Sequence, residues 1–166
     1  MSPDELSALW APWRVEYFTA GATPDFLLEA ARATDDAAHL VVTRRAHTFL
    51  IMNRYPYAVG HTMAVPCRKV GGLADLTSDE KLELWELAEH AQILLRKTIN
   101  AQGFNIGLNL GKCAGAGVVD HLHLHIVPRW EGDNNFMPVL AHTRILPEAL
   151  DSLYRKLLVT QSTLAS

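Results

Sequence analysis

Short stretches of alternating or continuous apolar residues recur along the chain, and this pattern is typical of β-strands. The predicted strands lie in HLVVTRRAHTFLIMN (39–53), HTMAVP (61–66), FNIGLNLG (104–111) and HLHLHIVPRW (121–130). The first of these segments contains two strands joined at a basic turn, and RYPYAVG supplies turn residues before the next strand. This order of strands and turns favours antiparallel hairpins.

Helical periodicity is clearest after Thr77, which has capping-box spacing with Glu80. The apolar residues of this helix recur every three or four positions, which predicts a face packed on the core. They are Leu84, Trp85, Leu87, Ala88, Ala91, Leu94 and Leu95. Gly103 follows the helix, where a left-handed stop is easy. Shorter helices are predicted around residues 26–32 and from Pro147 onward, whose fixed φ suits a first helical turn.

Three of the eight histidines fall within five residues, at alternate positions. On a strand, His121, His123 and His125 share one face, and Leu122, Leu124 and Ile126 enter the core on the other. Regular pairing should stop near Pro128, which has no amide to donate. Three interpretations stay open here: polar residues on a wet sheet face, a metal site, and a catalytic site with an imidazole nucleophile. The outer two Cα atoms lie roughly 13 Å apart on a strand, so one metal ion would not bind all three rings.

The strand before the histidines also has one apolar and one polar face. Phe104, Ile106 and Leu108 share the first, while Asn105, Gly107 and Asn109 share the second. The connecting GKCAGAG (111–117) contains three glycines, which let backbone amides approach an anion. It is not a Walker loop, because the GxxxxGK[ST] order is absent and no helix is predicted after it. An ordinary flexible turn explains the loop equally well by itself, but beside three histidines it is a candidate phosphate site.

Composition excludes several classes of function. A chain of 166 residues with 49% hydrophobic residues supports one domain with a proper core. Its net charge of −3 argues against general nucleic-acid binding, so a local group of residues must hold any anionic substrate. The start MSPDEL lacks the basic and apolar regions of a signal peptide, and no apolar stretch could span a membrane. Cys67 and Cys113 form no CxxC motif. We expect a cytoplasmic protein.

The stretch HLHLHIV matches the signature of the histidine-triad (HIT) superfamily, in which apolar residues separate and follow three histidines. NRYPYAVGH (53–61) and NLG (109–111) resemble the same superfamily. LWAPWRVEYF (9–18) and VPRWEGDNNFMPV (127–139) resemble its branch of diadenosine-polyphosphate phosphorylases and hydrolases. Since nearly the whole chain is covered, we expect one domain over residues 1–166, with the triad core at about 39–140. The resemblance implies an α+β fold: a five-stranded antiparallel sheet, a long helix and a C-terminal helix, usually paired as a homodimer.

The resemblance also implies cleavage of a dinucleoside polyphosphate, such as diadenosine tetraphosphate, at the α-phosphorus by phosphorolysis or hydrolysis. His123 would be the nucleophile that forms an adenylyl-histidine intermediate. His121 and His125 would flank the phosphate, His61 would support the triad, and Asn53 would contact the ribose. The remaining expected substrate-binding residues, on the phosphate side, are Asn109, Gly111, Gly115, Ala116 and Gly117.

One feature departs from the family pattern. Many bacterial members of this branch hold a structural zinc with an upstream CxxC and further histidines, but residues 19–47 contain no cysteine. His39 and His47 alone do not make a zinc site, so we expect no zinc, with apolar packing around residues 26–28 in its place. No cofactor is expected to be required, although Mg²⁺ could accompany the polyphosphate.

Two alternative functions stay open: a slow or non-catalytic nucleotide sensor, and a nucleoside phosphoramidate hydrolase. The intact nucleophile favours an enzyme, because a sensor does not need one. The expected partners are a small nucleotide substrate and a second copy of the chain, with neither nucleic acid nor membrane.

Overall fold

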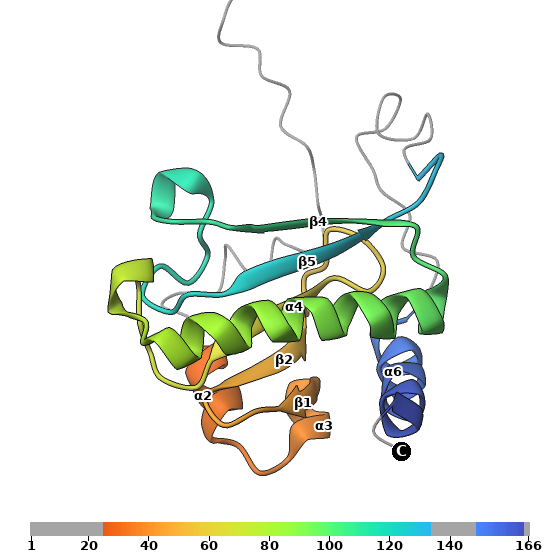
Figure 1. Ribbon diagram of the computed structural model, residues 1–166, viewed down its shortest axis with the longest axis horizontal. Coiled ribbons are helices and arrows are strands. Elements are labelled where there is room, and N and C mark those ends of the chain that lie inside the picture. The colour runs from red at the N-terminus through yellow and green to blue at the C-terminus, as the bar shows by residue number, and fades with distance from the viewer. Residues whose placement is uncertain (1–24, 134–148, 165–166) are drawn as a thin grey trace, which may run out of the picture.

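The computed structural model describes residues 25–133 and 149–164, and all structural statements below refer to these ranges (Figure 1). In chain order the elements are α2 (Phe26–Arg32), α3 (Asp36–His39), β1 (Val41–Arg44), β2 (Thr48–Met52), β3 (Thr62–Pro66), η2 (Leu73–Asp75), α4 (Ser78–Ile99), β4 (Gly103–Leu108), η3 (Lys112–Ala114), β5 (Leu124–Arg129) and α6 (Leu150–Leu164). The aromatic segment 9–18, the end of segment 127–139 and Pro147 lie outside the described residues.

The five strands form one antiparallel sheet in the order β1-β2-β3-β5-β4. This confirms the expected α+β fold with a five-stranded antiparallel sheet, a long helix and a C-terminal helix. β5 lies between β3 and β4, so the histidine strand adjoins the strand that follows His61. In this register His125 is opposite Met63 on β3 and opposite Gly107 on β4.

Apolar side chains of the sheet alternate between two cores. One core lies under α4 and α6 and includes Leu50, Ala64, Leu87, Leu94, Leu124, Ile126 and Leu157. The other lies on the opposite face with α2 and includes Leu27, Ala30, Phe49, Ile51, Met63 and Val65. Leu122, Leu124 and Ile126 are all buried in the first core, as the alternation predicts. The histidines between them therefore belong to the α2 side of the sheet.

α4 begins where the sequence predicts, but its buried face and its C-terminal end differ from the prediction. The Thr77 hydroxyl accepts from the Glu80 amide, and the Glu80 carboxylate accepts from the Thr77 amide, which completes the capping box. Trp85 was expected on the buried face, but it is 61% exposed, because it lies about 100° around the helix from Leu84. The helix ends at Asn100, whose left-handed φ of 52° makes the stop expected near Gly103. Gly103 instead begins β4.

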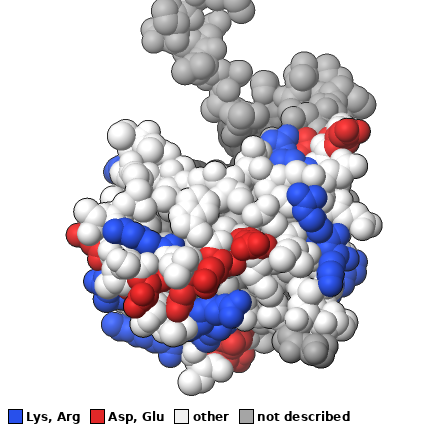
Figure 2. Space-filling model, in the orientation of Figure 1, with Lys and Arg blue, Asp and Glu red and all other residues white. Residues whose placement is uncertain are grey.

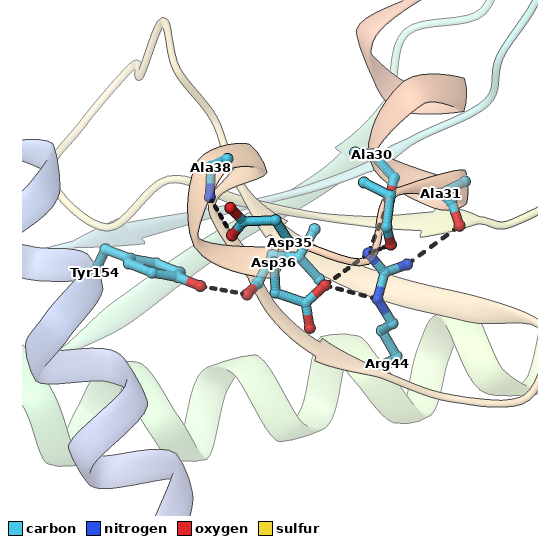
Figure 3. A network of polar contacts seen from close by, with 9 residues as sticks. Ala30, Ala31, Asp35, Asp36, Ala38, Arg44 and Tyr154 are labelled. Carbon is cyan, nitrogen blue, oxygen red and sulfur yellow. Dashed lines mark hydrogen bonds and ion pairs between the residues drawn. The ribbon is translucent and has the colours of Figure 1, made fainter.

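Arg44 on β1 holds the C-terminal end of α2 against the sheet (Figure 3). Its guanidinium pairs with Asp36 of α3 and donates to carbonyl oxygens at the end of α2, those of Ala30, Ala31 and Ala33. Carbonyls in the last helical turn have no partner within the helix, so this cation supplies one. α3, which the sequence pattern did not predict, is thereby joined to α2. The N-cap residue of α2, Asp25, lies next to His121.

α6 packs against α4 and β1 and buries Leu153 and Leu157. The hydroxyl of its Tyr154 donates to the Val41 carbonyl at 2.8 Å (Figure 3). None of the helices in the described ranges is long and apolar enough to cross a bilayer.

Acidic side chains follow α4 on the face shown in Figure 2, with basic side chains around them. On that face neither sign of charge forms a broad continuous field.

Candidate active site

Only the last of the three histidines lies in regular β-structure. β5 begins at Leu124, where its pairing with β3 also ends, so His121 and His123 precede the strand. A hydrogen bond from the Leu122 amide to the Val70 carbonyl, 2.7 Å long, holds this preceding segment. The three histidines are between 0% and 9% exposed. The interpretation of polar residues on a wet sheet face is therefore wrong.

His123 is held in the tautomer that a nucleophile requires. Its Nδ1 lies 2.8 Å from the His121 carbonyl oxygen, which can only accept, so Nδ1 carries the proton. Nε2 is then left with a lone pair, and among the described residues nothing hydrogen-bonds to it. Burial lowers the pKa of His123 below its usual value, although the hydrogen bond to the His121 carbonyl acts in the opposite direction. A neutral imidazole with one reactive nitrogen is the result.

His61 and His125 are hydrogen-bonded to each other, and the groups that donate to His61 determine which nitrogen of each ring carries the proton. The Tyr57 amide and the Asn53 side-chain nitrogen both lie within 3.3 Å of His61 Nδ1, so this nitrogen accepts. In the neutral ring the proton is then on Nε2, which donates to His125 Nδ1 over 2.9 Å. His125 therefore carries its proton on Nε2, next to the Asn109 amide at 3.4 Å. The Asn109 carbonyl oxygen, rather than its nitrogen, is the group that can accept there.

Asn53 is 8% exposed and is bonded at both ends of its amide. Its oxygen accepts from the Tyr55 amide at 2.8 Å, and its nitrogen contacts His61. The Tyr57 ring stacks on His61 with centroids 4.6 Å apart. The sequence pattern did not single out Tyr57, although the NRYPYAVGH stretch contains it. The structure thus places Asn53, His61, His125 and Asn109 in one connected chain.

The His121 ring is fully buried and contacts protein at both nitrogens. Nε2 lies 2.9 Å from the Pro66 carbonyl oxygen, and Nδ1 lies 3.3 Å from the Asp25 carboxylate. The ring therefore points into the protein, whereas the resemblance implies that it flanks the substrate phosphate. Sequence reasoning missed Asp25, because 96 positions separate it from His121. The only local signal was an N-cap residue type in front of a predicted helix.

The GKCAGAG loop is organised by glycines with positive φ. Gly111 and Gly115 both have φ of 85°, and open space surrounds the position of a Cβ at each, so the backbone conformation alone requires glycine. The amides of Ala114, Gly115 and Ala116 donate to carbonyls inside the loop. These amides are therefore already used in this conformation. The Gly117 amide is not among the amides that donate within the loop, and Gly117 is exposed.

Comparisons with known proteins identify the family. The model of the HIT domain matches residues 35–132. Over 95% of this chain and 85% of the relative, the sequence is 36% identical to a Mycobacterium tuberculosis protein named AP-4-A phosphorylase. A Dictyostelium discoideum bis(5'-adenosyl)-triphosphatase is 34% identical over 52% of this chain and 57% of its own length. This chain belongs to the HIT family.

A solved structure extends the comparison to the fold. A zinc-bound histidine triad family protein from Mycobacterium smegmatis superposes on 76% of this chain and 86% of its own, with a TM-score of 0.63 and 24% identity. This likeness concerns the HIT fold alone. The enzyme names of the sequence relatives confirm the expectation that this HIT chain is an enzyme.

The upstream residues of this HIT chain do not fit a structural zinc. Zinc needs about four nitrogen, sulfur or carboxylate ligands, and no three such residues gather within the described ranges. His39 is the last residue of α3, and His47 is exposed in the turn before β2. Leu27 is fully buried on the α2 side of the sheet, and Phe26 packs beside it.

Proposed function

We propose that this protein cleaves dinucleoside polyphosphates at the α-phosphorus through an adenylyl intermediate on His123. The observation that carries the proposal is the orientation of His123, with its Nδ1 proton on a backbone carbonyl and its Nε2 lone pair unused by described residues. The sequence relatives named for diadenosine polyphosphates support the substrate class. The site supports it chemically, since a buried neutral imidazole attacks phosphorus without first losing a proton.

In the first step, His123 Nε2 bonds to the α-phosphorus of diadenosine tetraphosphate. The bond from that phosphorus to its bridging oxygen breaks, and the electron pair leaves with ATP. His125 presents an Nε2 proton because His61 holds its other nitrogen. Donors fixed in this way stabilise the charge that develops on the phosphoryl and leaving oxygens. Asn109 and the loop of residues 111–117 are proposed to contact those oxygens as well.

In the second step, an oxygen of inorganic phosphate attacks the same phosphorus, and the bond to Nε2 breaks. The products are ADP and regenerated His123, so one diadenosine tetraphosphate and one phosphate give ATP and ADP. The Mycobacterium tuberculosis relative, named as a phosphorylase and aligned with 95% of this chain, favours phosphate over water. Near the end of β5, Arg129 pairs with Asp133 and donates to the Asn105 side chain.

Radiolabelled phosphate distinguishes the two acceptors. The protein is incubated with diadenosine tetraphosphate and labelled phosphate, and the nucleotides are separated by chromatography. Label in ADP supports phosphorolysis, whereas unlabelled AMP as the sole new product beside ATP means that water is the acceptor. A nucleoside phosphoramidate in a parallel reaction tests the hydrolase alternative. Binding without turnover of either substrate would indicate a sensor.

We also infer that residues 1–166 form one domain, that two copies of the chain pair as a homodimer, and that the protein is cytoplasmic. β4 is an edge strand of the sheet, and Leu82, Trp85 and Ile93 are exposed on α4. Exposed apolar side chains and a sheet edge unpaired by the described residues are features of a subunit interface. Light scattering should give twice the chain mass of 18.4 kDa. The mass of a single chain would contradict the dimer.

A further inference from the structure

We propose that Asp25 is a positioning residue for the triad: its carboxylate fixes the His121 ring and thereby the carbonyl that orients His123. The catalytic consequence rests on the proposed function, whereas the hydrogen-bond arrangement can be tested without any substrate. Asp25 lies just before α2, 96 positions from His121, and the sequence pattern gave it no role.

The surroundings of His121 require a charged partner. Its ring is completely buried, and each ring nitrogen faces an oxygen that can only accept. These oxygens belong to the Pro66 carbonyl at 2.9 Å and to the Asp25 carboxylate at 3.3 Å. A neutral imidazole has one N–H, so both contacts are hydrogen bonds only when both nitrogens are protonated. A buried imidazolium is stable only beside a compensating negative charge.

Asp25 is built to supply that negative charge. Its side chain is 15% exposed, its Oδ1 accepts from the Leu28 amide at 3.1 Å, and its Oδ2 lies 3.0 Å from Lys69 Nζ. Burial by itself raises the pKa of this carboxyl. The hydrogen bonds from Leu28 and Lys69, together with the charges of His121 and Lys69, outweigh burial and lower the pKa overall.

The His121 ring matters to the nucleophile because no strand ladder fixes residues 121–123. Regular pairing ends at Leu124. In the segment before it, the Leu122 amide donates a hydrogen bond to the Val70 carbonyl. Leu122 is also buried in the core under α4, whereas His121 is held through the two contacts of its ring. Its carbonyl accepts the Nδ1 proton of His123, so a shift of residue 121 changes the direction of the nucleophilic lone pair.

Asp25 itself has rigid support. Leu27 is fully buried in the core between α2 and the sheet. At the other end of α2, Arg44 holds the helix carbonyls (Figure 3). The carboxylate is therefore held by the packing of Leu27 and by the hydrogen bonds at the far end of the helix, as a group that orients a reactive side chain must be.

The test combines histidine nitrogen spectra with kinetics on Asp25→Asn. Asparagine keeps an oxygen that can cap α2, removes the charge and replaces the carboxylate oxygen that faces Lys69 with an amide nitrogen. Two-bond ¹⁵N–¹H spectra of the wild-type protein should show both His121 nitrogens protonated and His123 protonated at Nδ1. In D25N, His121 should lose one proton, and His123 should populate both tautomers. Turnover should fall roughly 10- to 100-fold, the usual cost of losing an orienting partner, with KM changed less than about twofold.

Asp35→Asn is the matched control. Asp35 caps α3 through the Ala38 amide at 3.1 Å, but it contacts no histidine. D35N should leave both the spectra and the turnover unchanged. A D25N protein with wild-type spectra overturns the proposal, whether or not its turnover falls.

The wild-type spectrum alone decides the arrangement if D25N fails to fold, since a single protonated nitrogen on His121 also overturns the proposal. Expected spectra in a protein that cleaves no dinucleotide would leave the arrangement of Asp25 and His121 intact. That result would overturn the proposed function instead. The two failures are therefore distinguishable.

Discussion

His123→Asn separates the two functions of the His123 imidazole. The asparagine amide nitrogen can occupy the place of Nδ1 and still donate to the His121 carbonyl, which lies 2.8 Å from Nδ1 in the wild-type protein. No atom of asparagine replaces Nε2, so the proposed nucleophile is lost. We expect turnover of diadenosine tetraphosphate to fall roughly 10⁴- to 10⁶-fold, as when other enzymes lose a nucleophile.

His123→Ala provides the comparison, because it removes the hydrogen bond as well. The lost bond is expected to cost about 0.5–1.5 kcal/mol, which lowers the melting temperature of a protein of this size by about 1–6 °C. H123N should therefore melt near the wild-type temperature, and H123A should melt below it. Both variants should lose turnover to the same extent.

The assay follows ATP release by chromatography, and calorimetry with a non-cleavable methylene analogue measures binding. H123N should bind the analogue with nearly wild-type affinity, because the other site residues remain. Turnover above about one per cent of wild type in H123N would refute the nucleophile assignment. An equal loss of binding and turnover would refute it too.

Three further predictions concern Asn53, Gly60 and the pH dependence that follows from His123. Asn53→Ala should weaken nucleoside binding by roughly 1–3 kcal/mol with little change in kcat; a lower kcat at unchanged KM would instead assign Asn53 to orienting His61. Gly60→Ala should destabilise the protein by about 2–4 kcal/mol, because its φ is 77° and a Cβ would lie 2.7 Å from Ile99 Cδ1. Gly132→Ala has a similar φ of 73° but open space, so it should cost less in urea unfolding. Because the pKa of His123 lies below its ordinary 6.5, the acid limb of kcat/KM should also lie below that value. The same shift makes the unfolded chain bind more protons just below pH 6.5, so stability should decrease as the pH is lowered through that range, and decrease less in H123N.

Local patterns predicted most of the fold. The capping box at Thr77, the strand alternation and the apolar stripe of α4 depend on neighbours along the chain, so the sequence contains their signals. The errors occur where tertiary contacts decide. Trp85 is apolar and adjacent to the stripe, yet it is exposed. α3 has only four residues, which is too few for a periodic signal.

The sequence indicated that the residues of the candidate site lie close together, but it did not indicate their environments. The alternation in HLHLHIV indicates that three rings share a side of the sheet, and the order of the strands brings His61 beside them. The rings are buried through tertiary contacts, such as those of His125 with His61 and Tyr57, which periodicity does not describe. The contacts of His121 with Asp25 and Pro66 join distant segments, and no spacing rule predicts them.

The three triad histidines have the same spacing but different partners, and the partners assign each a different chemical state. A backbone carbonyl takes the Nδ1 proton of His123 and leaves a lone pair on Nε2. His61 donates to Nδ1 of His125 and leaves a proton on Nε2. Two acceptors around His121 favour a proton on each nitrogen. One sequence repeat can therefore supply a nucleophile, a donor and a fixed cation, because each ring meets a different element of the fold.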